Sequence, residues 1–266
     1  MNNGDAFETI SALRRTIVVT GVASGIGLAT VDRLQSMNCR IISADLAGAD
    51  INVDLGTTEG RAAFTAAVGH LSEGSVDGVV AVAGIGTAPD AASIVSVNYF
   101  GAVATTEGLR AMMAATDPAN AVVVASTAAL LETSPAIISA CLAGDEVAAR
   151  VAARAEPMLA YSSSKAALAL WVRRTAIRPE WAGAGLCLNA VGPGGVVTPM
   201  TASFLATEEG REIMARTTPR ATANYAKPTA LAEMLAFLAT MRGGYVVGQV
   251  IFVDGGTDAI LRPTAL

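Results

Sequence analysis

The chain alternates between short apolar runs and longer segments in which apolar residues recur at helical spacing. The short runs are apolar on both faces, as in buried parallel strands, and they cover 16–20, 40–44, 51–53, 76–82, 121–125, 186–190 and 249–253. The longer segments predict helices, of which the first ends near 37 and the others cover 57–68, 91–115, 159–177, 201–216 and 229–241. Because strands and helices alternate, the pattern predicts an α/β fold in which helices cover both faces of a parallel sheet.

The stretch 16–45 forms a predicted strand, turn, helix and strand, a unit that is typical of dinucleotide binding. Gly21, Gly25 and Gly27 lie in the turn, where the backbone has to bend tightly and approach a pyrophosphate. The N-terminus of the following helix offers unpaired N–H groups to a phosphate. Asp45 ends the second strand, where its carboxylate can accept hydrogen bonds from ribose hydroxyls.

The length of 266 residues, without a linker rich in proline or serine, predicts one domain over 1–266. Within it, acids precede bases along a short amphipathic stretch, so that 130–157 is predicted to be a helical insertion. A second excursion, at 199–218, is expected to shape the substrate side.

The overall charge and the apolar runs exclude some classes of partner. A net charge of -5 argues against a nucleic-acid partner, whose phosphates require a basic surface. No apolar run approaches the roughly 18 residues of a membrane span, and 1–15 carry no targeting signal. We therefore expect a cytoplasmic protein that binds neither nucleic acid nor membrane.

The few cysteines and the single histidine limit the chemistry further. Cys39, Cys141 and Cys187 are odd in number and lie in apolar stretches, as reduced packing thiols do. His70 is the only histidine, which excludes a Ser/His/Asp triad. Because no cluster of histidine and cysteine exists, we expect no metal site.

Ligands bind beyond the carboxyl ends of the strands in such sheets, so the residues that follow each strand are site candidates. Behind that edge, Tyr161 and Lys165 are four residues apart on a predicted helix and share one face. A lysine ammonium and a cationic nicotinamide nearby would lower the pKa of the phenol, which could then relay a proton to a carbonyl or carbinol oxygen. The spacing alone fits a surface tyrosine and lysine equally well.

Several motifs together resemble the short-chain dehydrogenase/reductase family, in that family's order across nearly the whole chain. They are the glycine turn from Thr20 to Gly27, Asn98, Ser126 with Thr127, Tyr161-x-x-x-Lys165, Asn189-x-x-x-Pro193-Gly194 with Thr198, and Asp254-Gly255-Gly256. Three stretches, 54–61, 96–102 and 254–264, are similar to the bacterial 3α-hydroxysteroid dehydrogenase/carbonyl reductases within that family. The resemblance implies a single Rossmann-like, doubly wound parallel sheet of about seven strands in the order 3-2-1-4-5-6-7, with helices on both faces.

The resemblance also implies catalytic roles for five residues. Tyr161 would be the acid/base, Lys165 would lower its pKa and contact a ribose, and Asn98 would hold a water that links Lys165 to solvent. Thr127 matches the position of the family's catalytic serine, and Ser126 lies beside it. Since neighbouring strand residues face opposite sides, we expect Thr127 to face the substrate, although Ser126 remains an alternative.

The cofactor is expected to be NAD and not NADP, because Asp45 would face a 2′-phosphate and neither Ser24 nor Leu46 supplies a cation. The residues expected to bind it are Gly21, Ser24, Gly25, Ile26, Gly27, Asp45, Asp54, Leu55, Ala83, Gly84, Tyr161, Lys165, Pro193, Gly194, Val196 and Thr198. The chain departs from the family at 81–84, where Ala-Val-Ala-Gly replaces Asn-Asn-Ala-Gly, and in the longer segment between Thr127 and Tyr161.

We therefore expect an NAD-dependent oxidoreductase that interconverts a hydrophobic secondary alcohol and its ketone, with hydroxysteroids and aromatic or alicyclic carbonyl compounds as first candidates. The alternatives are an aryl or other alcohol dehydrogenase of the same family, a member with epimerase or dehydratase chemistry, and a non-catalytic dinucleotide-binding regulator. A homo-oligomer is expected. A dimer through 229–241 and the last strand is favoured over a tetramer, because the insertion would crowd the helices that carry Asn98 and Tyr161.

Overall fold

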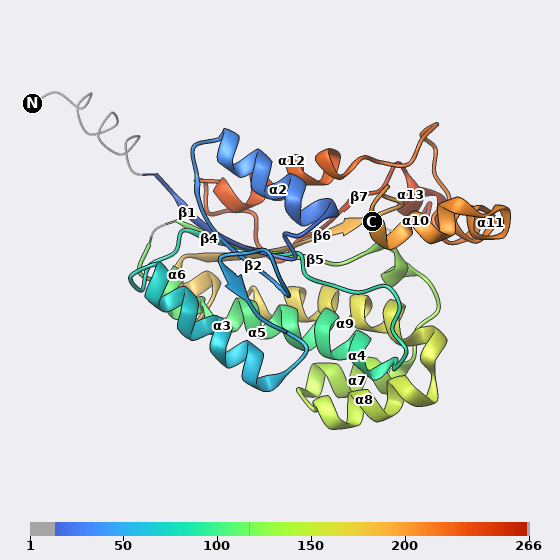
Figure 1. Cartoon of the computed structure of the whole chain (residues 1–266), viewed down its shortest axis with the longest axis horizontal. Coiled ribbons are helices and arrows are strands. Elements are labelled where there is room, and N and C mark those ends of the chain that lie inside the picture. The colour runs from blue at the N-terminus through green and yellow to red at the C-terminus, as the bar shows by residue number, and fades with distance from the viewer. Residues whose placement is uncertain (1–13, 117, 265–266) are drawn as a thin grey trace, which may run out of the picture.

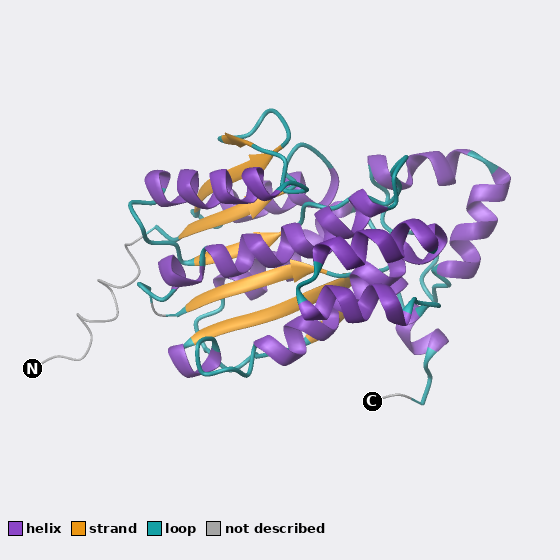
Figure 2. Cartoon of the chain, turned by 90° about the horizontal axis from the view of Figure 1, so that it is seen from below, coloured by secondary structure: helices purple, strands orange, loops and turns teal. Residues whose placement is uncertain are grey.

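The protein is described by a computed structural model for residues 14–116 and 118–264. Its strands form one sheet of seven parallel strands in the order β3-β2-β1-β4-β5-β6-β7, which confirms the predicted topology. Figure 2 shows the strands lying side by side between layers of helices. The strands are β1 (Thr16–Thr20), β2 (Arg40–Asp45), β3 (Ile51–Asn52), β4 (Gly78–Ala81), β5 (Ala119–Val124), β6 (Leu186–Pro193) and β7 (Val250–Val253).

The two faces of the sheet are buried against separate groups of helices. In β1, Val18 packs into one core, whereas Ile17 and Val19 pack into the other, because successive strand residues point to opposite faces. Figure 1 shows α2 and α12 on one face and α3, α5 and α9 on the other. These helices are α2 (Gly25–Ser36), α12 (Pro228–Thr240), α3 (Thr58–Leu71), α5 (Ala102–Gly108) and α9 (Ala160–Thr175).

The prediction of one continuous helix over 91–115 is wrong. The segment divides into α4 (Ala92–Val95), the π-helical turn η1 (Ser96–Gly101), α5 and α6 (Arg110–Met113). A π-helical turn adds a residue to the helical turn and turns side chains away from the regular register, which the spacing of apolar residues does not reveal. Asn98 lies in η1, where its side chain is fully buried.

The inserted segment is helical, as its sequence predicted. It forms a hairpin of α7 (Pro135–Ala143) and α8 (Glu146–Ala155), in which α7 packs against α9 and α8 packs against α4. Gly144 ends α7 in the left-handed conformation, and the Asp145 carboxylate caps α8 by accepting a hydrogen bond from the Ala148 N–H. The two helices are therefore separated by a sharp turn and lie side by side.

The remaining elements are two helices after β6, one helix after β7 and three short 3₁₀ turns. The helical excursion predicted over 201–216 consists of two helices, because Thr207 ends the first helix and caps the second. These elements are α10 (Pro199–Ala206), α11 (Glu208–Thr217), α13 (Thr257–Leu261) and the short 3₁₀ turns η2 (Thr127–Leu130), η3 (Pro157–Leu159) and η4 (Ala182–Ala184).

Two properties of the described residues bear on membrane and metal binding. No helix there has both the length and the apolar character needed to cross a bilayer. Residues 14–116 and 118–264 also bring together no group of three metal-ligating side chains. The expectation of no targeting signal falls mostly on residues 1–13, which lie outside the described part of the chain.

Candidate active site

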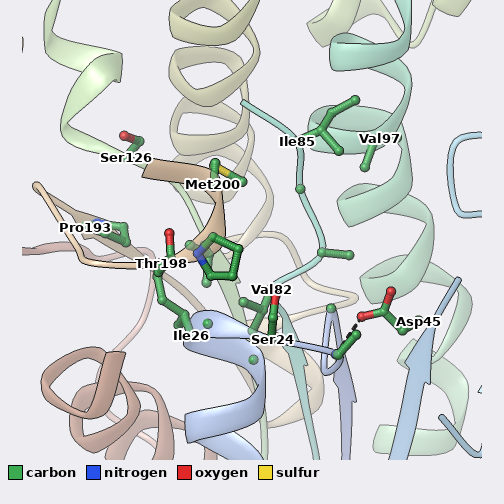
Figure 3. Close-up of a pocket in the computed structure, with 18 of the residues that line it drawn as sticks. Ser24, Ile26, Asp45, Val82, Ile85, Val97, Ser126, Pro193, Thr198 and Met200 are labelled. Atoms are coloured by element: carbon green, nitrogen blue, oxygen red, sulfur yellow. Dashed lines mark hydrogen bonds between the residues drawn. The ribbon is translucent and has the colours of Figure 1, made fainter. Parts of the chain in front are cut away.

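A cleft of about 330 Å³ opens beyond the carboxyl ends of the strands, a volume within the range of small-molecule sites. All of the predicted cofactor residues line it, namely Gly21, Ser24, Gly25, Ile26, Gly27, Asp45, Asp54, Leu55, Ala83, Gly84, Tyr161, Lys165, Pro193, Gly194, Val196 and Thr198. Figure 3 shows Asp45 and Ser126 toward opposite ends of this cleft, and it also shows Pro193, which ends β6, and Thr198, which precedes α10.

Several lining residues were not among the sequence candidates. Most of them are neighbours of predicted positions. Ile85, Val97 and Met200 form apolar walls of the cleft but belong to no sequence motif. Their place in the cleft depends on how far each loop reaches, which the pattern along the chain does not specify. The set is Ala23, Ala44, Leu46, Val53, Val82, Ile85, Val97, Val124, Ala125, Pro199, Met200 and Thr201.

The glycine turn leaves no room for side chains. Gly21 has a φ of +73°, and a Cβ on it would lie 2.7 Å from the backbone nitrogen of Ala83. The Thr20 hydroxyl accepts hydrogen bonds from the Val82 N–H at 3.2 Å and the Ala83 N–H at 3.1 Å. The turn is thereby held against the end of β4, and the N-terminus of α2 opens into the cleft, where it suits a phosphate.

Asp45 lies at the end of β2 with its carboxylate turned toward the glycine turn. Its Oδ2 accepts a hydrogen bond from the Ala23 N–H at 2.8 Å, and its Oδ1 accepts one from the Leu46 N–H at 2.7 Å (Figure 3). Among the described residues that line the cleft, Lys165 is the one cationic side chain, and it belongs to α9. The Asp45 end of the cleft is therefore negatively charged.

Tyr161 and Lys165 project from α9 into the cleft. Lys165 is 4% exposed, and its Nζ donates a hydrogen bond of 2.7 Å to the carbonyl oxygen of Val124, at the end of β5. Burial lowers the pKa of this lysine to about 8, because the ammonium has lost its hydration.

The expected lowering of the pKa of Tyr161 is not found in the protein alone. Burial raises the pKa of this phenol above its ordinary value, and a side-chain hydrogen bond with Ser126 offsets part of that rise. The ammonium of Lys165 is turned to the Val124 carbonyl. Lowering the phenol pKa would thus require a further positive charge, such as that of an oxidised nicotinamide.

Asn98 does not line the cleft but holds its wall from behind. Its Oδ1 accepts a hydrogen bond from the Ile85 N–H at 2.8 Å, and its Nδ2 donates one to the Ile85 carbonyl at 2.9 Å. A Cβ on Gly84 would lie 3.1 Å from Asn98 Oδ1 and 3.5 Å from Lys165 Nζ, so both side chains end close to Gly84. The water-holding role of Asn98 stays a prediction.

The expectation that Thr127 faces the substrate is wrong. Thr127 is fully buried, and its Oγ1 has no hydrogen-bond partner among the described residues. The alternation of strand residues does not apply here, because β5 ends at Val124 and the chain then enters the 3₁₀ turn η2. Ser126 caps that turn by accepting a hydrogen bond from the Ala128 N–H at 3.1 Å. Ser126 lines the cleft and shares a hydrogen bond with Tyr161.

The opening of the cleft beside Ser126 is covered by the start of α10. The Thr201 hydroxyl accepts a hydrogen bond from the Thr198 N–H at 3.0 Å, which fixes the first turn of this helix. Met200 extends over the loop after β4, where a Cβ on Gly86 would lie 3.1 Å from its Cγ. Met200 and Ile85 thus form an apolar boundary on the outer side of the cleft (Figure 3).

Comparison with known proteins gives several matches over most of the chain. Residues 21–258 match the family model described as enoyl-(acyl carrier protein) reductase. The chain is 36% identical over 256 residues to a 3-alpha-hydroxysteroid dehydrogenase/carbonyl reductase of Comamonas testosteroni, and this alignment covers 93% of the chain and 98% of the relative. It is 30% identical to a cis-4-hydroxycyclohexanecarboxylate dehydrogenase of Sinomonas cyclohexanicum, with 97% of the chain and 100% of that protein covered.

A solved structure agrees with these sequence matches. The crystal structure of a 3-alpha-hydroxysteroid dehydrogenase from Pseudomonas sp. B-0831, complexed with NADH, superposes with a TM-score of 0.88 at 37% identity. The superposition covers 94% of this chain and 100% of that one. The similarity therefore extends over the whole sheet and the helices around the cleft.

Proposed function

Because this chain belongs to the short-chain dehydrogenase/reductase family, we propose that it is an NAD-dependent oxidoreductase that interconverts a hydrophobic secondary alcohol and its ketone. The observation that carries the proposal is the convergence of Ser126, Tyr161 and Lys165 on the cleft that also contains the glycine turn. Binding a dinucleotide alone requires no phenol paired with a buried lysine, so this convergence favours an enzyme over a regulator.

The proposal of NAD as the cofactor depends on Asp45. Its carboxylate is held by the Ala23 and Leu46 N–H groups, and it lies where an adenosine ribose would meet β2. A ribose 2′-hydroxyl can donate a hydrogen bond to such a carboxylate, whereas a 2′-phosphate would be repelled. The similar structure from Pseudomonas sp. B-0831 contains NADH, which agrees with this proposal.

In the proposed reaction, three side chains handle the substrate oxygen and its proton. When bound, NAD would supply the hydride chemistry, accepting a hydride from a carbinol carbon or returning it to a carbonyl carbon. Tyr161 would take the proton from the carbinol oxygen during oxidation and return it during reduction. Ser126 would donate a hydrogen bond to the same oxygen, and the ammonium of Lys165 would favour the phenolate form of Tyr161 once an oxidised nicotinamide adds a second positive charge nearby.

The proposed substrate class follows from the walls near Ser126. Ile85 and Met200 present apolar side chains there, and the described lining supplies no cation near them other than Lys165. Such a pocket suits an uncharged ring that bears one hydroxyl or carbonyl group. The two relatives described above are named for a hydroxysteroid and for cis-4-hydroxycyclohexanecarboxylate, and both compounds carry a hydroxyl group on a ring, although the second also carries a carboxylate. We therefore infer that a ring-bearing secondary alcohol is the substrate.

We also propose that the protein acts as a cytoplasmic homodimer. The α7–α8 hairpin covers part of α9 and α4, so a second subunit has less room on that face. On the other side, β7 is the last strand of the sheet and is only half-buried, and Phe237 on α12 is 58% exposed. A half-buried apolar edge strand, together with an exposed aromatic ring on the helix that contacts it, favours pairing with a second copy there.

A panel of secondary alcohols, incubated with NAD at alkaline pH, tests the proposed function. We expect reduced cofactor with hydroxysteroids or with aromatic or alicyclic alcohols and little with primary aliphatic alcohols. Binding of NAD without turnover of any alcohol or ketone would favour the regulator instead. Product analysis distinguishes epimerase or dehydratase chemistry, because those reactions leave no net reduced cofactor.

A further inference from the structure

Arg61 joins three segments of the chain that are far apart in sequence. It lies on α3, and its side chain is 11% exposed. Its Nε donates a hydrogen bond of 2.8 Å to the Leu55 carbonyl, and its Nη2 donates one of 2.9 Å to the Ser96 carbonyl. Its Nη1 and Nη2 also donate to the two carboxylate oxygens of Glu146, at 2.6 and 2.9 Å. This paired geometry is the stronger, bidentate form of an arginine–carboxylate interaction.

Two of the segments that Arg61 joins form a wall of the cleft. Leu55 lines the cleft, and so does Val97, which follows Ser96. The segments also touch each other, because a Cβ on Gly56 would lie 3.1 Å from Val97 Cγ2. Leu55 follows β3 and Ser126 follows β5, and β2, β1 and β4 lie between these two strands in the sheet. Leu55 therefore lies on the side of Asp45 and Asp54, where the adenosine of a dinucleotide is expected.

Glu146 holds the arginine in place from the inserted hairpin. It begins α8, and its side chain is 23% exposed. Burial favours the protonated acid, but hydrogen bonds from Arg61 and Ser96 outweigh it, so the pKa of Glu146 lies below its usual value. Arg150, one turn later in α8, donates a hydrogen bond of 2.7 Å to the Ser96 hydroxyl. The hairpin is thereby attached to the same wall at two points.

We propose that Arg61, held by Glu146, is a positioning residue for the adenosine half of the cofactor, which it serves by fixing the wall that Leu55 and Val97 form. The inference rests on the proposed function, since it assumes that a dinucleotide occupies the cleft. The guanidinium directs its N–H groups to protein acceptors, so it acts through the Leu55 and Ser96 carbonyls and not by touching the ligand.

The test is calorimetric binding of ADP-ribose, which carries the adenosine half of NAD but no nicotinamide. Arg61→Met should weaken this binding by about tenfold or more, because two wall carbonyls lose a charged donor and the wall can shift. Arg61→Lys should not restore the affinity, since a single ammonium cannot reproduce the fork of contacts. The turnover number at saturating NAD should stay within about twofold of wild type, because the reacting groups lie at the other end of the cleft.

Two further variants separate positioning from simple loss of stability. Glu146→Gln keeps the shape of the side chain but removes its charge, and it should weaken ADP-ribose binding while the protein stays folded. Arg154→Met is the matched control, because Arg154 pairs with Asp90 at 2.7 Å from the same helix but touches neither Leu55 nor Ser96. It should leave ADP-ribose binding unchanged.

The outcomes are distinguishable from failure of the proposed function. Unchanged ADP-ribose affinity in Arg61→Met and Glu146→Gln would overturn the positioning role, even in an active enzyme. An equal loss in Arg154→Met would overturn it too, because the effect would then belong to the hairpin as a whole. If wild type binds ADP-ribose but oxidises no alcohol, the proposed function fails while the positioning role stands. If wild type does not bind ADP-ribose, both fail.

Discussion

The carboxylate of Asp45 accepts a hydrogen bond from the Ala23 N–H at 2.8 Å, so the end of β2 is tied directly to the glycine turn. The same carboxylate accepts a second hydrogen bond from the Leu46 N–H. Its position is therefore fixed by two backbone donors before any ligand arrives. A carboxylate held in this way can select between ligands that differ in charge at that place.

The first prediction concerns the choice of cofactor. Two like charges about 4 Å apart repel by about 4 kcal/mol at an effective dielectric constant of about 20, which corresponds to several hundredfold in affinity. We therefore expect kcat/KM with NAD to exceed that with NADP by at least this order. Asp45→Asn should reduce the ratio of kcat/KM with NAD to kcat/KM with NADP, because it removes the negative charge. Comparable kcat/KM values for the two cofactors in wild type would contradict the role of Asp45.

The second prediction distinguishes the two hydroxyl groups that follow β5. Ser126→Ala should lower kcat by about 10² to 10³, the effect of losing one hydrogen-bond donor to a reacting oxygen. Thr127→Val is the matched control and should keep activity, because Thr127 Oγ1 is buried without a partner in the described structure and lies outside the cleft lining. Kinetics of the two variants with one alcohol decide the question. Loss of activity in Thr127→Val alone would reverse the assignment.

The difference between these two residues shows what the sequence could and could not predict. The strands and the parallel sheet followed from the apolar runs, because those runs reflect burial directly, whereas the strand order followed from the resemblance to the family. The side on which Ser126 lies depends on a 3₁₀ turn that begins just after β5, and no periodicity marks that turn. The role of Met200 likewise depends on how far α10 reaches across the cleft.

The insertion shows the same division between local and tertiary information. Its helices could be predicted from Asp145 and the amphipathic pattern, since caps and charges act within one turn. The pairing of Glu146 with Arg61 could not, because the two residues are 85 positions apart and meet only when α8 packs against α4. The π-helical turn around Asn98 could not be predicted either, because its extra residue does not change the kinds of residue that indicate a helix.

The third prediction follows from the lowered pKa of Lys165. Burial lowers this pKa to about 8. Between roughly pH 8 and pH 10 the amine is therefore protonated in the unfolded chain but has released its proton in the folded protein. The unfolded state then binds more protons, so Lys165 makes the free energy of unfolding rise with pH across this window. Below pH 8 the buried ammonium carries its full cost, of about 3 kcal/mol.

Lys165→Met should lack this dependence, and chemical denaturation of both proteins from pH 7 to pH 10 measures it. Burial raises the pKa of Cys39, Cys141, Cys187 and Tyr161, which acts in the opposite direction at high pH. The difference between wild type and Lys165→Met cancels these contributions. As the pH rises, the free energy of unfolding of wild type should increase relative to that of Lys165→Met. A difference that does not change with pH would show that Lys165 titrates normally.

The fourth prediction concerns the dimer. Phe237 is 58% exposed on α12, a helix that contacts the edge strand β7, and we expect it to be covered by a second copy. Phe237→Glu should shift the protein to a monomer, because it would bring two carboxylates together across a twofold interface. Val151→Glu on α8 is the control, since Val151 is 60% exposed and lies on the inserted hairpin. Light scattering at micromolar concentration measures both, and a stable tetramer or a monomeric wild type would refute the dimer.

The fifth prediction tests the reaction itself, with an alcohol from the panel that carries deuterium at the carbinol carbon. After incubation with NAD, mass spectrometry of the reduced cofactor should find the deuterium transferred to it by wild type. Tyr161→Phe should bind NAD with nearly unchanged affinity but transfer less than about a tenth of the wild-type amount, because a positioned acid/base contributes about 10² to 10⁴. Reduced cofactor without the deuterium, or full transfer by Tyr161→Phe, would contradict hydride transfer with Tyr161 as the acid/base.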